Sequence, residues 1–172
     1  MKATLLLTAL LISLNLSALE LEQKPQEAII SGENGGLVLD GSQWSSKSIK
    51  EKVYVMFYVD PDEKDLNEHF SQALKKKHYD EKYFGSIAII NLAATWKPNF
   101  IIEKILKSKQ EEFPRTIYVK DKNKILVKEW KLADDSSDIL LFNRDGKLLF
   151  YKAGAMNEKD MQKIFMLIEE NI

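Results

Sequence analysis

The run Val53–Val59 restricts the fold of this chain more than any other feature, because every residue in it is apolar. Most of these residues are β-branched or aromatic, and the run has no polar face. Such a strand is typical of the centre of a sheet that is buried on both sides. Asp60-Pro61-Asp62 ends the strand, and the spacing of Leu66, Phe70 and Leu74 predicts a helix over residues 65–77.

The rest of the chain continues this alternation of strands and helices. Gly85–Ile90 is typical of a second buried strand, and a helix is predicted over residues 99–112. The apolar side of that helix is predicted to contain Phe100, Ile101, Ile102, Ile105 and Leu106. Further strands are predicted at residues 37–39, 116–119, 139–142 and 147–152, residues 125–132 fit either a strand or a helix, and Asn157 can cap a last helix.

This order of elements predicts an α/β protein, because a sheet that alternates with helices is covered by helices on both faces. The closing hairpin around Asn143–Gly146, followed by a helix, favours a thioredoxin-like three-layer fold with a mixed central sheet. We assign residues 1–18 to a signal peptide, residues 19–34 to a polar lead-in segment and residues 35–172 to the thioredoxin-like domain.

The first residues have the layout of a secretory signal. Lys2 precedes an almost wholly apolar stretch, Ala3–Leu16, and the small residues Ser17-Ala18 follow it. This stretch is too short for a comfortable transmembrane span. We therefore expect cleavage after Ala18, export of the protein and no stable membrane span in the mature protein. An uncleaved N-terminal anchor is the alternative.

Composition excludes several classes of function. The chain has no cysteine, which excludes disulfide exchange, thiol peroxidase chemistry and thiolate metal sites. Its 25 basic and 26 acidic residues give a net charge of −1, which argues against nucleic-acid binding. No cofactor motif is present, so we expect no cofactor. His69 and His78 are interpreted as exposed, and Trp44, Trp96 and Trp130 as core or rim residues.

One segment, Trp130–Gly154, has a recognisable pattern. It combines a tryptophan, an acidic-acidic-Ser-Ser segment, a strand, Asp-Gly, a second strand and a glycine, at Trp130, Asp134, Asp135, Ser136, Ser137, Asp145, Gly146 and Gly154. In this pattern, and in Lys64–Asn67 and Ile89–Asn91, the chain resembles the YtfJ family of periplasmic, thioredoxin-like bacterial proteins over roughly residues 36–170. The resemblance implies the fold and the compartment, and it transfers no catalytic residue.

Acidic residues stand where redox proteins of this fold carry thiols. In those proteins a Cys-x-x-Cys motif follows the first central strand, where a helix N-terminus lowers the thiol pKa. The candidate binding residues here are Asp60, Asp62, Glu63 and Asp65 in that loop, and Asp134, Asp135 and Asp138 in the loop that replaces the cis-proline before the hairpin. Open α/β sheets bind ligands at the carboxyl ends of their strands, so we expect the two loops to lie side by side.

Three functions are compatible with these loops. The first is a monomeric, non-catalytic module that binds a periplasmic protein or peptide, and we favour it. The second is a site for a divalent cation such as Ca²⁺ at loops 60–65 and 134–138, since carboxylate oxygens suit hard cations. The third is a hydrolase that uses two carboxylates as acid and base. The simplest interpretation of the same residues is helix capping and solvated loop charge.

Overall fold

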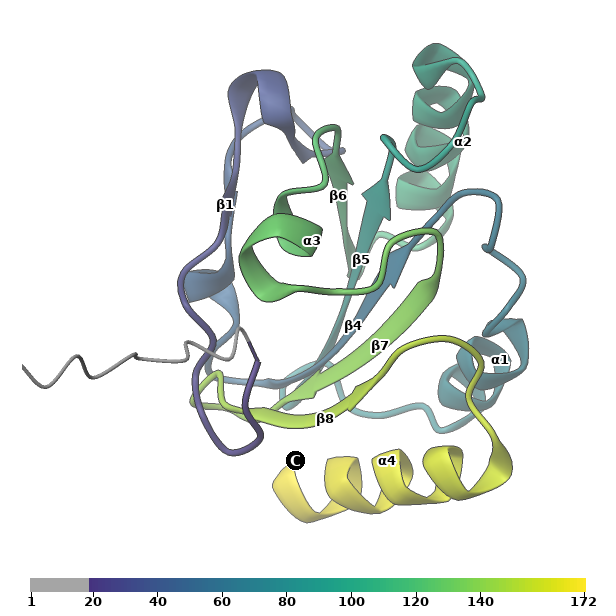
Figure 1. Cartoon of the computed structure of the whole chain (residues 1–172). Helices are drawn as coiled ribbons and strands as arrows, with labels where there is room; N and C mark the ends of the chain where they lie inside the picture. The colour runs from purple at the N-terminus through teal and green to yellow at the C-terminus, as the bar shows by residue number, and fades with distance from the viewer. Residues whose placement is uncertain (1–18) are drawn as a thin grey trace, which may run out of the picture.

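The computed structural model describes residues 19–172 and contains a six-stranded mixed sheet (Figure 1). Its strands, in the spatial order β2-β6-β5-β4-β7-β8, are β2 (Gly35–Leu37), β4 (Val53–Val59), β5 (Phe84–Asn91), β6 (Thr116–Asp121), β7 (Ser137–Phe142) and β8 (Leu148–Lys152). β4, β5 and β6 are parallel, whereas β2, β7 and β8 pair antiparallel with their neighbours. The predicted mixed sheet is therefore confirmed. Two short strands, β1 (Ile29–Ile30) and β3 (Trp44–Ser45), pair beside it.

β4 is a central strand and coincides with the predicted run Val53–Val59. It pairs with β5 on one side and with β7 on the other. Val53 and Val55 join the apolar core on one face of the sheet, and Met56 and Tyr58 join the core on the other face. Each of these four side chains is at most 1% exposed, as a strand without a polar face requires.

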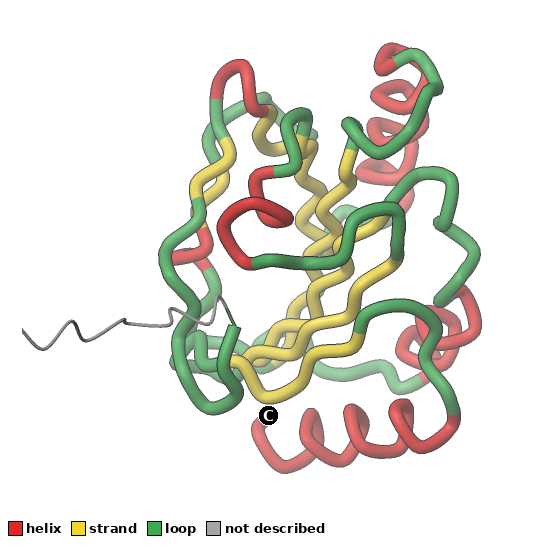
Figure 2. The backbone as a smooth tube through the Cα atoms, in the orientation of Figure 1, coloured by secondary structure: helices red, strands yellow, loops and turns green. Residues whose placement is uncertain are grey.

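Helices cover both faces of the sheet, as predicted (Figure 2). α1 (Glu68–Lys76), α2 (Asn99–Glu112) and α4 (Glu158–Asn171) lie on one face, and the short α3 (Ile125–Trp130) lies on the other. The predicted cap of the last helix is confirmed: the Asn157 side chain accepts from the Asp160 N–H, and the Asp160 carboxylate accepts from the Asn157 N–H.

The segment before β4 packs onto the α3 face of the sheet and includes two turns of 3-10 helix, Gly32–Asn34 and Ser46–Ser48. Ala28 and Ile30 are buried there, and the Glu22 N–H donates to the Leu148 carbonyl at 2.7 Å. The polar lead-in segment is thus in contact with the domain along its length. The predicted signal peptide, residues 1–18, lies outside the described residues. None of the helices within residues 19–172 has the length and apolar character that crossing a membrane requires.

One local prediction needs correction, and one open alternative is resolved. The strand expected at residues 37–39 is β2 (Gly35–Leu37), and Leu39 is 76% exposed because the chain turns away at Asp40-Gly41. For residues 125–132, where strand and helix were both left open, the structure has the helix α3 over Ile125–Trp130, with Leu126 and Trp130 buried on the sheet.

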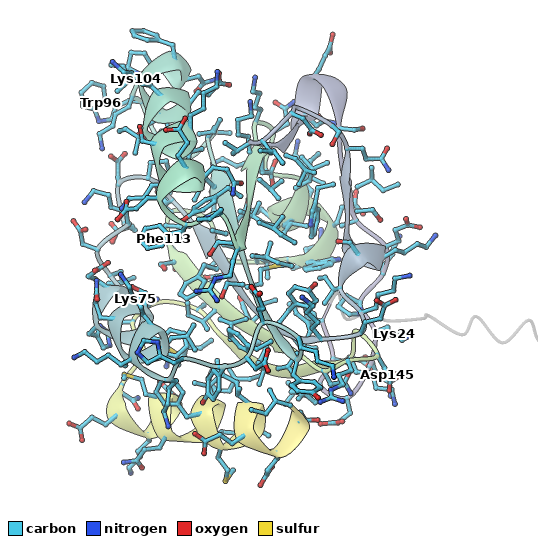
Figure 3. All side chains as sticks on the ribbon, turned by 180° about the vertical axis from the view of Figure 1, so that it is seen from behind. Lys24, Lys75, Trp96, Lys104, Phe113 and Asp145 are labelled. Atoms are coloured by element: carbon cyan, nitrogen blue, oxygen red, sulfur yellow. The ribbon has the colours of Figure 1, made fainter. Side chains whose placement is uncertain are left out.

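The outer side of α2 also differs from the prediction. The sheet covers one side of this helix, so Ile102 and Leu106 are buried while Phe100, Ile101 and Ile105 are 73%, 43% and 51% exposed. Trp96 is 85% exposed and points away from the body beside the first turns of α2 (Figure 3), so its assignment to the core or rim is wrong.

Candidate functional site

A layer of buried polar side chains lies at the carboxyl ends of the parallel strands, on the face that α3 covers. Tyr58, Asn91, Asp121 and Asp138 each lie two residues along a strand from a core residue on that face, so strand alternation turns them inward. Each is at most 1% exposed. Because buried polar groups need hydrogen-bond partners, the bonds of these side chains hold this edge of the sheet together.

Asp121 accepts hydrogen bonds at both carboxylate oxygens. Its Oδ1 accepts from the N–H groups of Asn123 at 3.2 Å and Ile125 at 2.9 Å. Its Oδ2 accepts from the Leu126 N–H at 3.2 Å and from the Tyr58 hydroxyl at 3.1 Å. The first N–H groups of α3, which have no partner within the helix, are thereby satisfied. Asp121 joins the end of β6 to β4 and to the start of α3.

Asn67 connects three segments around the same edge. Its Nδ2 donates to the Ser137 carbonyl, the Ser137 hydroxyl and the Gly154 carbonyl, each at 3.1 Å. Its Oδ1 accepts from the Met156 N–H at 2.8 Å. The side chain is 3% exposed, so all of these bonds lie in the interior. Asn67 therefore fixes the start of α1 against β7 and against the segment that leads into α4.

The two acidic loops lie side by side, as the fold predicted. The Asp60 N–H donates to the Ser136 carbonyl at 2.8 Å, which extends the pairing of β4 with β7. Lys124 forms an ion pair with Asp134 at 2.5 Å, and the Asn91 amide donates to the other Asp134 oxygen at 3.0 Å. The bond to Asp134, together with the nearby charges of Asp135 and Asp60, raises the pKa of Lys124. Lys124 is therefore bonded to Asp134 and lies in the electrostatic field of Asp60 and Asp135.

The other predicted residues have different surroundings. Asp62 pairs with Lys97 and accepts from the Thr95 hydroxyl at 2.7 Å, while Asp65 pairs with the adjacent Lys64 at 2.7 Å. Within residues 19–172, Glu63 and Asp135 form no ion pair. Asp135 has a left-handed backbone, with φ of 53°. Free negative charge at this edge is therefore concentrated on these two side chains.

Burial distinguishes two of the carboxylates. Asp138 is fully buried, and its Oδ2 accepts from the Ala133 N–H at 2.8 Å and the Tyr151 hydroxyl at 3.2 Å. Burial raises the pKa of Asp138 above its ordinary value. Burial also raises the pKa of Asp60, which is 4% exposed, and the charges of nearby carboxylates add to that effect.

Nowhere in residues 19–172 do three or more histidine, aspartate or glutamate side chains converge as metal ligands would. Asp62, Asp65 and Asp134 instead pair with lysines, and Asp60 and Asp138 are buried. The cation hypothesis therefore has no ligand cluster among the described residues to support it.

The buried and the paired aspartates should respond to pH in opposite directions. Asp138 binds its proton more tightly in the folded state than in the unfolded state. Its contribution to the free energy of unfolding is therefore largest at low pH and is lost as pH rises above about 4. Burial opposes the ionisation of Asp134, but the Lys124 ammonium and the Asn91 amide outweigh it and lower the pKa of Asp134. The contribution of Asp134 to the free energy of unfolding is therefore lost as pH falls below about 4.

Urea unfolding at pH 3 and at pH 7 tests this difference. Relative to the unsubstituted protein, Asp138→Asn should gain free energy of unfolding as pH rises, and Asp134→Asn should lose it. Shifts in the same direction for the two variants would contradict the assignment.

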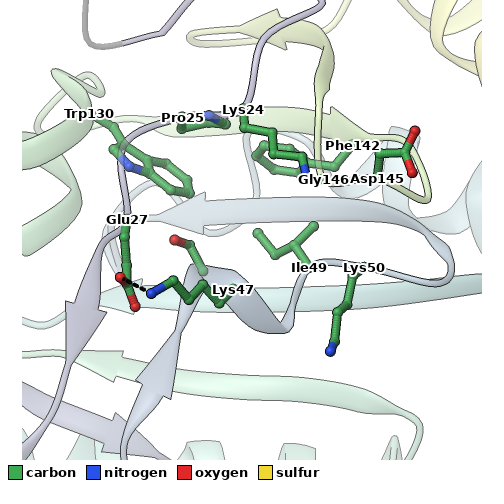
Figure 4. A pocket seen from close by; sticks show the side chains of 11 residues that line it. Lys24, Pro25, Glu27, Lys47, Ile49, Lys50, Trp130, Phe142, Asp145 and Gly146 are labelled. Atoms are coloured by element: carbon green, nitrogen blue, oxygen red, sulfur yellow. Dashed lines mark ion pairs between the residues drawn. The ribbon is translucent and has the colours of Figure 1, made fainter.

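A cavity of about 350 Å³ lies at the opposite end of β7, between the N-terminal segment and the turn at Gly146 (Figure 4). Lys24, Lys47 and Lys50 stand at its rim, and Lys47 pairs with Glu27 at 2.5 Å. The side chains of its floor, Ile49, Trp130 and Phe142, are 4%, 1% and 0% exposed. This cavity lies away from the two acidic loops, and none of the predicted site residues lines it.

The sequence did not single out four residues that organise the edge: Asn67, Asn91, Asp121 and Lys124. Asn67 and Asn91 do end the two segments Lys64–Asn67 and Ile89–Asn91 that carried the family resemblance. Asp121 gave a weaker signal: it is an acidic residue at the end of a strand, and the turn that follows supplies backbone N–H groups for its carboxylate. Lys124 gave none, since its partner Asp134 is ten residues further along the chain.

Solved structures of similar shape define the class of protein. The chain superposes on a putative protein disulfide isomerase from Bacteroides thetaiotaomicron with a TM-score of 0.63 and 18% sequence identity, covering 89% of this chain and 90% of that one. A putative thiol:disulfide interchange protein DsbE from Chlorobium tepidum gives a TM-score of 0.59 and 13% identity, covering 89% and 98% of the two chains. At these identities the likeness shows the fold alone, and the fold is thioredoxin-like.

Within this class, residues 22–171 match the model of a family described as bacterial proteins of unknown function, YtfJ_HI0045, and the chain belongs to that family. It is 24% identical to the Escherichia coli (strain K12) protein YtfJ, covering 99% of this chain and 97% of the relative. A Haemophilus influenzae protein is 27% identical, covering 87% and 85% of the two chains. Without cysteine, the chain is a thioredoxin-like protein that is not a thiol-disulfide oxidoreductase.

Proposed function

We propose that the protein is exported to the periplasm and acts there as a non-redox, thioredoxin-like binding module. Its recognition surface is the carboxyl edge of the sheet, formed by loops 60–65 and 134–138. The observation that carries the proposal is the contact between these loops, through the Asp60 N–H and the Ser136 carbonyl, at the place where redox proteins of this fold carry thiols. The apolar stretch and small residues within 1–18 support export.

The charges at this edge indicate the chemistry of the partner. Glu63 and Asp135 supply free carboxylates, while Asp62 and Asp134 hold lysines through ion pairs whose side chains are about a third exposed. Ion pairs of this exposure contribute little to stability. Lysine or arginine side chains of a partner could therefore replace Lys97 and Lys124 as the partners of Asp62 and Asp134. The edge therefore suits a basic segment of a protein or peptide.

Affinity capture from a periplasmic extract tests the proposal. Immobilised protein should retain a partner that the double variant Asp62→Ala/Asp135→Ala loses, and the retained amount should fall as salt is raised. A matched control, Asp145→Ala/Glu170→Ala, removes the same charge from exposed positions far from the loops and should capture as the unsubstituted protein does. A partner held equally by all three proteins, or none held by any, would contradict the proposal.

A further inference from the structure

The outer side of α2 is an exposed apolar patch with no partner within residues 19–172. Its four large side chains are Trp96, Phe100, Ile105 and Ile101, which are 85%, 73%, 51% and 43% exposed. Phe100 and Ile101 belong to the first turn of α2, and Ile105 lies one turn after Ile101 on the same stripe. We call these four residues the α2 patch. Large exposed apolar side chains gathered at one element are typical of an interaction surface.

Lysines flank the α2 patch. Lys104 and Lys107 follow Phe100 at helical spacing and form no ion pair with any described residue. Lys75 and Lys109 each lie 5.1 Å from the centre of the Phe113 ring. Figure 3 shows Trp96, Lys104, Phe113 and Lys75 along one side of the molecule, at α2 and the end of α1.

The charge of this side favours an anionic occupant. This side carries four ammonium groups, on Lys75, Lys104, Lys107 and Lys109, and the carboxylates of α2 are Glu111, Glu112 and Glu103, which pairs with Lys120 and Lys122. Of the other two, Glu112 is already paired with Lys109 at 2.9 Å, which leaves Glu111. Lys97, next to Trp96, pairs with Asp62 and so neutralises the nearest carboxylate of the acidic loop.

We propose that this side of the protein docks onto the surface of an anionic phospholipid bilayer. Trp96 and Phe100 enter the interfacial region, where aromatic side chains are favoured, and Lys104 and Lys107 contact the lipid phosphates. The shape supports a broad surface over a peptide as occupant, because the patch stands outward from the body and lines neither the 350 Å³ cavity nor a second cavity of about 250 Å³ beside β2. This inference does not rest on the proposed partner at the acidic loops.

The tryptophans provide a built-in probe for the test. Trp44 and Trp130 are 2% and 1% exposed, so a change of emission on adding vesicles reports on Trp96. The chain from Leu19 holds every element of the described fold and lacks the apolar N-terminal stretch, which would itself bind lipid. With phosphatidylglycerol vesicles, we expect a blue shift of emission and flotation of the protein with the vesicles. Phosphatidylcholine vesicles should produce neither.

Two variants locate the docking surface. Lys104→Glu/Lys107→Glu should weaken partition onto phosphatidylglycerol at least about tenfold, and Trp96→Ala/Phe100→Ser should abolish flotation. The control Lys147→Glu/Lys159→Glu makes the same charge change on other exposed elements and should have a much smaller effect. The proposal would be overturned if the protein did not float with phosphatidylglycerol vesicles, or floated equally with phosphatidylcholine vesicles. It would also be overturned if both patch variants floated as the unsubstituted protein does. A blue shift that grows with protein concentration without vesicles would overturn it too, since a second copy would then cover the patch.

Discussion

Replacing Asn67 with leucine is expected to lower the free energy of unfolding by about 3–4 kcal/mol, because several buried groups lose their partners at once. The Met156 N–H, the Ser137 hydroxyl and the carbonyls of Ser137 and Gly154 all bond to this amide. Leucine has a similar volume and can bond to none of them. Urea titration monitored by circular dichroism measures the change, and the slope against urea should stay constant.

A suitable control for Asn67 lies on the same helix. The exposed Gln72 donates one bond, to Glu68, so Gln72→Leu should change stability by no more than about 0.5 kcal/mol. A loss below about 1 kcal/mol for Asn67→Leu would show that Asn67 does not hold α1, β7 and the α4 approach together.

Replacing Asp121 with alanine should cost about 3 kcal/mol or more, because three N–H groups and the Tyr58 hydroxyl then have no acceptor in the interior. The loss should also loosen α3, whose Leu126 and Trp130 are part of the core. Chemical denaturation gives the free energy, and the near-ultraviolet circular dichroism of Trp130 reports on the packing of α3.

Tyr58→Phe separates the contributions around Asp121. It removes one of the four bonds and should cost about 1 kcal/mol in the unsubstituted protein. In the Asp121→Ala background the same change should cost less, since its partner is already absent. Equal costs in both backgrounds, or an Asp121→Ala loss no larger than that of Tyr58→Phe, would contradict the capping role.

The elements with a strong periodic pattern were predictable from the sequence. The strand Val53–Val59 and the helix at residues 99–112 have the bounds that their patterns indicated, and Asn157 caps α4. Residues 125–132 were not assignable, because Ile125–Trp130 is shorter than two helical turns and so shows no period. What makes it a helix is Asp121, a residue outside it, together with burial against the sheet.

The exposure of the α2 patch could not be predicted from the sequence, since apolar residues occur on three sides of that helix. A sheet covers only one of them, and the sequence does not say which. The same limit holds for the acidic loops. Their composition identified the edge but not the burial of each residue. Asp138 belongs to β7, where strand alternation turns it inward, whereas Asp62 lies in the loop after β4 and pairs with Lys97.

Photo-crosslinking in the cells that make the protein tests its central claim most directly. A photoreactive residue is placed in the full chain at position 64, in the acidic loop 60–65, or at position 145, in the turn at the opposite end of β7. The account predicts a discrete protein adduct from position 64 in the periplasmic fraction, lost when Asp62→Ala/Asp135→Ala is added, and none from position 145. The same adducts from both positions, or an adduct from position 145 alone, would contradict the assignment of this edge as the binding surface.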